Sequence, residues 1–165
     1  MGIINVTDYT GAHDIVDFFL QCSIVYFDFE TTGLDPYTNQ LLILSLHGTV
    51  GADTRTYTFD LVRLGMEILH ELRAVLEHPD IIKVAHNTIF DWKWLYHNAG
   101  IYTAPVYCTM IGEQVIKSGL IFSGFGLDDV AERRLNIKMD KSIRQSFINR
   151  DISVPFTDEE FFMRE

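Results

Sequence analysis

The sequence IVYFDFETTGLDP, at residues 24–36, carries the strongest structural pattern in this chain. Its first half is an almost continuous run of β-branched and aromatic residues, which predicts a strand buried on both faces. Asp28 and Glu30 end this run two positions apart, and alternation along a strand points both side chains to the same side of a sheet. Gly33 and Pro36 then end the strand in a loop.

Two carboxylates this close repel each other, and both lose solvation as they approach a core. A divalent cation would compensate for both effects, and the hard oxygen ligands of Asp28 and Glu30 suit magnesium or manganese. The simpler alternative is a strand end that opens into solvent and carries two ordinary surface acids. The Thr-Thr-Gly-Leu sequence at residues 31–34 favours the metal site.

Length and composition indicate one domain that covers residues 1–165. Hydrophobic residues make up 47% of the chain and aromatic residues 13%, which is enough for one well-filled core. No apolar run reaches the roughly 18 residues of a membrane span, and residues 1–10 do not resemble a signal peptide. We therefore expect a cytoplasmic protein with no membrane partner, in which Cys22 and Cys108 are reduced core thiols.

The net charge of −10 argues against a general nucleic-acid-binding surface. Residues 131–150 are the exception, because they hold 6 basic and 2 acidic residues. This basic segment has two readings. It is either a contact surface for phosphates or a solvated helix face.

Apolar periodicity predicts strands and helices in a mixed order. The predicted strands are residues 3–6, 24–30, 40–47, 54–60, 81–85 and 106–110, with a hairpin turn at 48–53. The predicted helices are a segment that ends at residue 20 and is capped by Asp8 or Thr10, then 66–76, 87–99, a segment that ends at 117, 127–135, and a last helix after Thr157. Three antiparallel strands followed by alternating helices and strands predict an α/β fold with a mixed sheet flanked by helices. The last helix is expected to be incomplete at residue 165.

The sequence HNTIFD, at residues 86–91, follows a predicted strand and begins a predicted helix. Asn87 is a good helix-capping residue. Asp91 lies one turn later and faces back toward the strand ends. Taken alone, Asp91 also fits an acid that stabilises the positive end of a helix dipole.

Three segments together resemble the DEDD superfamily of 3'-to-5' exonucleases. FDFETTGL (27–34) resembles its first motif, and AHNTIFD (85–91) resembles its second. Residues 126–146 are similar to the segment before the last motif in ribonuclease D-like enzymes and in the proofreading domains of family A DNA polymerases. The resemblance implies a ribonuclease H-like fold and a substrate that is a single-stranded DNA or RNA 3' end.

The resemblance also implies a site with two Mg²⁺ or Mn²⁺ ions about 3.5–4 Å apart. Asp28 matches the acid that bridges both ions, Glu30 a ligand of the water-activating ion, and Asp91 the acid that holds the second ion. The products would be nucleoside 5'-monophosphates.

Several other residues match substrate-binding positions of the family. Leu34 matches a residue that wedges between the last two bases, although it also fits an ordinary loop leucine. The backbone amides around Thr31 and Thr32 would contact the terminal nucleotide. The remaining candidates are Asn87 and Phe90, which equally fit a helix cap and a core aromatic, and the phosphate contacts Lys141 and Arg144.

The chain departs from the family pattern near its last residue. The family requires a fourth acid on the last helix, with a tyrosine four residues before it or a histidine five before it. No tyrosine follows Tyr107 and no histidine follows His97, and Phe161 and Glu165 have the spacing without the hydroxyl. We therefore expect weak metal binding and poor cleavage by this chain, with the rest of a longer nuclease or polymerase as its natural context. The alternatives are an inactive module of this fold that binds nucleic-acid ends or a protein partner, and a dimer.

Overall fold

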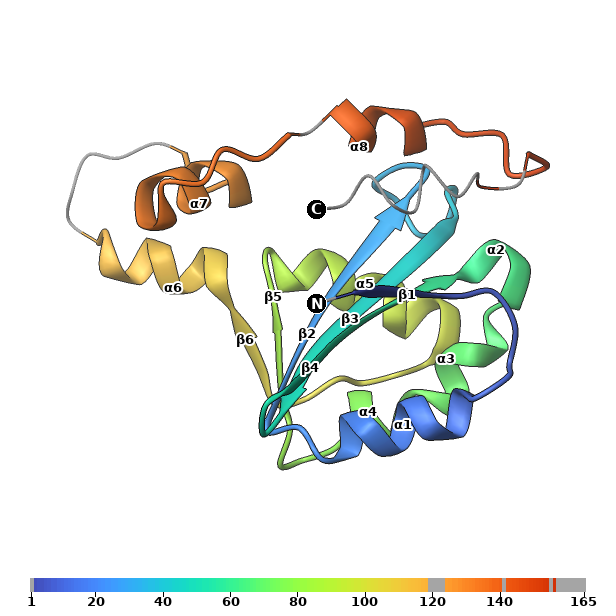
Figure 1. Cartoon of the computed structure of the whole chain (residues 1–165). Coiled ribbons are helices and arrows are strands. Elements are labelled where there is room, and N and C mark those ends of the chain that lie inside the picture. Colours follow the sequence, from blue (N-terminus) through green and yellow to red (C-terminus); the bar gives the residue numbers. More distant parts are fainter. Residues whose placement is uncertain (1, 119–123, 141, 155, 157–165) are drawn as a thin grey trace.

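Six strands form one mixed sheet at the centre of the molecule (Figure 1). The computed structural model describes residues 2–118, 124–140, 142–154 and 156. The strands are β1 (Ile3–Val6), β2 (Ile24–Thr31), β3 (Leu41–Val50), β4 (Asp53–Asp60), β5 (Ile82–Ala85) and β6 (Val106–Cys108). They lie in the order β1-β4-β3-β2-β5-β6, with β2, β3 and β4 antiparallel and the other neighbours parallel. The predicted α/β fold and its three antiparallel strands are confirmed.

Several helices form a layer under the sheet, and others lie beside its edge (Figure 1). Their bounds are α1 (Ala12–Leu20), α2 (Leu61–Leu64), α3 (Glu67–Glu71), α4 (Arg73–Leu76), α5 (Thr88–Ala99), α6 (Thr109–Ile116), α7 (Leu127–Leu135) and α8 (Ser142–Phe147). The layer contains α1, α3, α4 and α5, whereas α6 and α7 lie beside the β6 edge. Within the described ranges, no helix has the length and apolar character needed to cross a membrane. The predicted last helix lies outside the described residues.

Strand β2 is buried on one face only. Val25, Phe27 and Phe29 point into the main core and are at most 4% exposed, while the alternate residues of the strand are exposed up to Asp28. The prediction that both faces are buried is wrong, because the helix layer covers a single face. In the described part of the chain, the opposite face is covered at its end, where Phe147 of α8 joins a small buried cluster with Ile43.

Several predicted boundaries also differ from the structure; for example, the last strand ends at Cys108 and not at residue 110. The turn between β3 and β4 is shorter than predicted, because the two strands pair as far as Val50 and Asp53 and leave two residues between them. Gly51 in that turn has a φ of +60°, which glycine adopts without strain. The helix predicted at residues 66–76 is divided into α3 and α4. Its apolar positions are buried on both sides of the division, which is why the sequence shows one continuous period.

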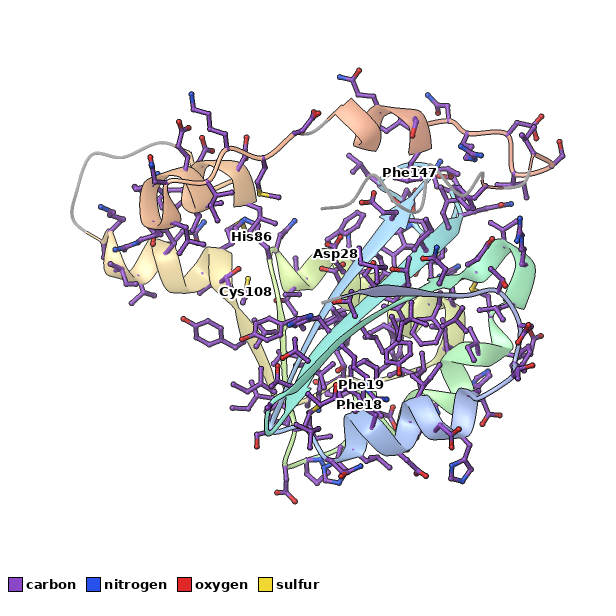
Figure 2. All side chains as sticks on the ribbon, viewed as in Figure 1. Phe18, Phe19, Asp28, His86, Cys108 and Phe147 are labelled. Carbon is purple, nitrogen blue, oxygen red and sulfur yellow. The ribbon has the colours of Figure 1, made fainter. Side chains whose placement is uncertain are left out.

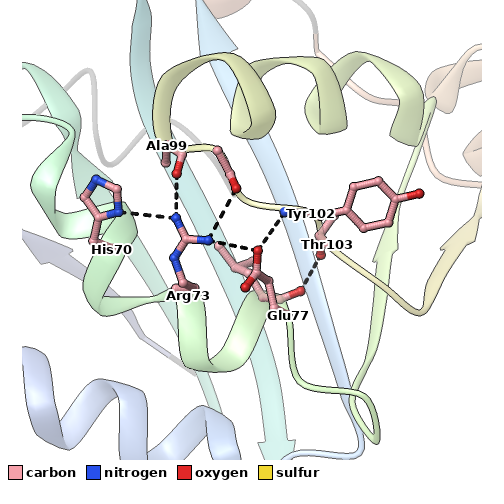
Figure 3. A network of polar contacts seen from close by, with 8 residues as sticks. His70, Arg73, Glu77, Ala99, Tyr102 and Thr103 are labelled. Carbon is pink, nitrogen blue, oxygen red and sulfur yellow. Dashed lines mark hydrogen bonds and ion pairs between the residues drawn. The ribbon is translucent and has the colours of Figure 1, made fainter.

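Arg73 joins α4 to the end of α5 (Figure 3). Its Nη2 donates to the Ala99 carbonyl oxygen at 2.6 Å, and its Nη1 donates to the Gly100 oxygen at 3.3 Å. Nη1 also pairs with Glu77 Oε1 at 3.0 Å, and that oxygen accepts from the Tyr102 amide at 2.8 Å. The guanidinium therefore satisfies carbonyls that the helix end leaves without partners and stabilises its negative end.

Replacing Arg73 with alanine is expected to lower the free energy of unfolding by about 1.5 kcal/mol, because hydrogen bonds from a charged donor are lost at a partly buried helix end. Urea unfolding measures this change. Lys138→Ala is the control, since its pair with Glu132 is long at 3.9 Å and its side chain is 88% exposed. Equal, small losses in both variants would contradict the assigned role of Arg73.

Lys83 is a fully buried cation in β5. Its Nζ donates to the carbonyl oxygens of His78 and Ala104, each at 2.6 Å. These carbonyls favour the ammonium, but burial disfavours it more strongly and lowers the pKa of Lys83 to about 8. The folded protein therefore releases this proton at a lower pH than the unfolded chain does.

The stability of the protein is expected to rise between pH 8 and the ordinary lysine pKa, because the unfolded chain binds the extra proton there. Relative to Lys83→Met, the wild-type free energy of unfolding should increase on the order of 1–2 kcal/mol between about pH 7.5 and about pH 9.5. Urea unfolding at both pH values measures the difference. Parallel pH profiles for the two proteins would show that Lys83 does not titrate in this way.

Candidate active site

Asp28 and Glu30 lie on the face of β2 opposite the main core (Figure 2 shows Asp28). Their register partners in β3 are Ser45 and Ile43, while Phe29 between them is buried in the core. The side chain of Asp28 is exposed and that of Glu30 is half-buried. The register shifts directly after Glu30, which ends the regular ladder at the site. The predicted alternation thus places both acids on one face.

Asp91 reaches β2 where the pairing between β2 and β5 stops. The parallel ladder runs as far as Tyr26 and Val84, so the backbone of β2 beyond it has no partner in β5. There, the Phe29 amide donates to Asp91 Oδ1 at 3.2 Å. Asp91 is only 1% exposed and lies in the first turn of α5. The carboxylate is therefore held next to the strand that carries Asp28.

The environment of Asp91 makes its negative charge unfavourable. Burial raises its pKa to about 8, and the nearby charge of Asp28 adds to this effect, while the hydrogen bond from the Phe29 amide opposes it. A divalent cation near both carboxylates would favour the ionised forms, and a set of carboxylate oxygens fits Mg²⁺ or Mn²⁺. Among the described residues, however, no three His, Cys, Asp or Glu side chains are already grouped closely enough to hold a metal ion. The structure places Asp91 against the β2 backbone next to Asp28, whose charge it senses, and places Glu30 two residues further along the same strand.

The sequence of almost the whole chain agrees with a known family. A sequence profile described as 3'-5' exonuclease matches residues 3–156. The chain belongs to the 3'-5' exonuclease family. The predicted resemblance to DEDD exonucleases is thereby confirmed. No curated protein sequence matches the chain.

Several solved structures share the fold of this exonuclease-family chain. Brucella melitensis NrnC is 21% identical, with a TM-score of 0.71 over 98% of this chain and 73% of that one. Escherichia coli RNase D is 18% identical, with a TM-score of 0.77 over 98% of this chain and 40% of that one. Trypanosoma brucei RNase D in complex with RNA U12 is 14% identical, with a TM-score of 0.81 over 96% of this chain and 56% of that one. At these identities the likeness shows the ribonuclease H-like fold, as predicted.

The end of β2 and the loop that follows it carry three of the predicted exonuclease substrate contacts. Leu34 is 70% exposed and therefore accessible. Thr31 Oγ1 donates to the Gly33 carbonyl at 2.6 Å. The Thr32 amide donates to the Gln40 carbonyl at 3.0 Å, so this amide is already used within the protein. Thr32 therefore closes the base of the loop.

The second exonuclease motif supplies Asn87 and Phe90. Asn87 adopts a left-handed conformation, with a φ of 62°, and its side chain does not cap α5. Asn87 thus occupies the predicted N-cap position, and its carbonyl oxygen accepts from the Phe90 amide at 2.8 Å, but its side chain makes no capping hydrogen bond. Phe90 is half-buried, packs on the main core and makes an edge contact with Trp94 at 6.1 Å between ring centroids. Lys141 and the side chain of Arg144 lie outside the described residues.

The basic segment at 131–150 is partly neutralised in this exonuclease-family fold. Buried Glu113 of α6 pairs with Arg133 at 3.1 Å and with Arg134 at 2.9 Å. These ion pairs connect α6 to α7. Arg133 and Arg134 are thus engaged within the protein, and the charge of the segment alone overstates its capacity for phosphates.

His86 received no role from the sequence, yet it connects three elements near the exonuclease site (Figure 2). Its Nδ1 lies 2.9 Å from Thr109 Oγ1 at the start of α6, and its Nε2 lies 2.9 Å from the Phe125 carbonyl oxygen. The sequence signal that could have identified His86 is its position directly after a predicted strand. The carboxyl ends of parallel strands meet at one edge of a sheet, where sites form.

Cys108 is free, as predicted, but it is half-buried at the end of β6 and not a core thiol. Burial alone would raise the pKa of its thiol, but hydrogen bonds from the Ile111 amide and from Thr88 and the Asn87 amide lower it below its usual value. The second motif and the start of α6 thus meet at this sulfur. Cys22, in contrast, is a buried core thiol.

An apolar groove of about 710 Å³ lies between α5, β6 and α6. Its lining includes Ile89, Trp92, Ile111 and Val115, and it contains no carboxylate. Such a lining offers no carboxylate to a hard cation such as Mg²⁺ and no basic side chain to a phosphate. The carboxylates at the end of β2 therefore remain the candidate metal site.

Proposed function

We propose that the chain is a divalent-metal-dependent 3'-5' exonuclease domain that removes 5'-mononucleotides from single-stranded DNA or RNA. The observation that carries this proposal is the contact of Asp91 with the backbone of β2. It joins Phe29 of the first motif to Asp91 of the second, residues 62 positions apart, and the charge of the adjacent Asp28 acts on Asp91. Two observations on similar proteins support it: NrnC has been solved with bound Mg²⁺ and with bound pGG, and Trypanosoma brucei RNase D with RNA U12.

In this proposal Asp28, Glu30 and Asp91 hold Mg²⁺ or Mn²⁺. When bound, a pair of such ions supplies an activated water and charge compensation for the leaving 3' oxygen. The Phe29 amide orients the Asp91 carboxylate, and burial of Asp91 keeps bulk water from competing with it. Exposed Leu34 separates the terminal base from its neighbour. The residues of the chain therefore orient the metal-binding carboxylates and the terminal base, and they supply the negative charge that holds the ions.

We further propose that this 165-residue chain cleaves slowly. The family pattern implies a fourth carboxylate and a water-orienting tyrosine or histidine on its last helix, and Phe161 and Glu165 are the nearest matches in the sequence. A site with three carboxylates would hold its ions less tightly than one with four. Domains of a longer nuclease or polymerase would be its natural partners.

The test uses 5'-labelled single strands of DNA and of RNA, incubated with the chain and Mn²⁺. The proposal predicts products shortened one nucleotide at a time from the 3' end, no cleavage with a chelator, and no cleavage when the 3' nucleotide is inverted. Internal cuts, or shortening of the inverted-end strand, would show a different activity.

A second candidate is a catalytically inactive module that binds nucleic-acid ends. Among the described residues, no three His, Cys, Asp or Glu side chains are grouped closely enough to hold a metal ion, which favours an inactive module. This reading predicts that Asp28→Ala leaves strand binding unchanged and that no Mn²⁺-dependent cleavage exists in the wild type. A product ladder in the wild type would exclude it.

A further inference from the structure

Tyr37 is a highly exposed aromatic residue on the loop between β2 and β3. The loop begins directly after Glu30 and Thr31, and its base is closed by Thr32. The ring of Tyr37 is 81% exposed. Packing within the protein therefore does not account for an aromatic side chain at this position.

The backbone around Tyr37 is held in a fixed turn. The Tyr37 amide donates to Asp35 Oδ1 at 3.0 Å, and the amides of Thr38 and Asn39 donate to the Asp35 carbonyl oxygen at 3.2 and 2.9 Å. Asn39 Oδ1 in turn accepts from the Asp35 amide at 3.3 Å. An aromatic ring on a pre-ordered turn loses little conformational freedom when a ligand stacks on it.

His97 of α5 supports the ring from one side. The Tyr37 and His97 ring centroids are 4.5 Å apart with an angle of 64° between the planes, an edge contact that leaves most of the Tyr37 ring in solvent. His97 lies six residues after Asp91, which is about 9 Å along a helix axis. The aromatic pair is thus connected to the carboxylate site both through the loop and through α5.

The same side of α5 carries further aromatic and cationic groups. Phe90, Lys93 and His97 follow one another at spacings of three and four residues, which places them along one helix face. Lys93 Nζ lies 6.0 Å from the Phe90 ring centroid. No carboxylate of the described residues forms an ion pair with Lys93, in contrast to Arg133 and Arg134.

We propose that Tyr37 and His97 form a stacking subsite for an unpaired base of a single-stranded nucleic acid, with Lys93 near an adjacent phosphate. Exposed aromatic rings beside an unpaired cation are the combination by which proteins hold single strands. This inference rests on the proposed function, which places the 3' end at Asp28 and Asp91. The base on Tyr37 therefore belongs to a nucleotide on the 5' side of the terminal one.

The experiment measures fluorescence anisotropy of 5'-fluorescein oligothymidylates of two to eight nucleotides, with the 165-residue chain and Ca²⁺ in place of Mn²⁺. Tyr37→Ala is expected to weaken binding of the longer strands about tenfold and to leave the dinucleotide unchanged. Tyr37→Phe should bind like the wild type, because the ring and not the hydroxyl stacks. Tyr102→Ala is the matched control, since Tyr102 is 64% exposed and makes an edge contact with Trp92 at 5.5 Å.

A second arm places a single abasic site at successive positions of the longest strand. One position should weaken wild-type binding as much as Tyr37→Ala does, and the two changes together should cause no further loss. Equal binding of wild type and Tyr37→Ala at every length, or an equal loss in Tyr102→Ala, overturns the inference. Circular dichroism confirms that each variant is folded.

The outcomes separate this inference from the proposed function. A wild type that cleaves with Mn²⁺ while Tyr37→Ala binds normally overturns the subsite and leaves the function standing. Tyr37-dependent binding without any Mn²⁺-dependent cleavage supports the subsite and overturns the nuclease function. A wild type that binds no strand overturns both.

Discussion

Asp28→Ala is expected to reduce the Mn²⁺-dependent release of mononucleotides by on the order of a thousandfold, whatever the absolute rate of the wild type. The charge of Asp28 acts on Asp91, whose carboxylate accepts from the amide of the neighbouring Phe29 where the two motifs meet. Its removal takes a ligand from the proposed metal ions but no atom from the core, because the side chain is exposed. Initial rates on a 5'-labelled single strand measure the change.

Asp53→Ala serves as the control for Asp28→Ala. Asp53 is also an exposed acid of the sheet, and it pairs with Arg55 at the turn between β3 and β4. This variant should cleave at the wild-type rate. An Asp28→Ala protein that is folded and retains a tenth or more of the wild-type rate would contradict the proposed role of Asp28.

Trp94→Ala should lower the free energy of unfolding by about 3–5 kcal/mol. Trp94 is fully buried between α5 and the sheet, where it makes an edge contact with Phe90, and its replacement leaves a large cavity. It lies one turn after Asp91, so the same cavity loosens the helix that carries this acid. Urea unfolding gives the free energy.

Trp92→Ala is the matched control, because this tryptophan is on the same helix but lies on the wall of the apolar groove and stacks on Tyr96. We expect it to destabilise the protein by less than half as much. Trp94→Phe should retain most of the stability, since Trp94 Nε1 has no hydrogen-bond partner in the described part of the chain. Similar losses for both tryptophans would show that α5 does not depend on the core contact.

The sequence was sufficient to predict the sheet and the first half of the site. The period of two in β2 correctly placed Asp28 and Glu30 on one face, because strand alternation needs no tertiary information. It did not reveal which face of β2 is covered, since an exposed Tyr26 and a buried Phe27 look alike in a run of aromatic residues. Coverage depends on helices that come both earlier and later in the chain.

Long-range contacts account for the rest of what the sequence could not show. The contact of Asp91 with the Phe29 amide joins residues 62 positions apart, so no local pattern predicts it. The basic segment looked available for phosphates because Glu113, about 20 residues earlier, gave no sign that it pairs with Arg133. Tyr37 in a polar turn has no periodicity at all, and only its contact with His97 distinguishes it from an ordinary loop residue.

Manganese binding tests the central claim most directly, because it reports on the carboxylate site without depending on catalysis. The electron paramagnetic resonance signal of free Mn²⁺ is measured while the chain, Asp28→Ala or Asp53→Ala is titrated. We predict that the wild type and Asp53→Ala remove the signal alike and that Asp28→Ala binds at least about tenfold more weakly. Identical binding by the wild type and Asp28→Ala would contradict the metal site and, with it, the proposed nuclease.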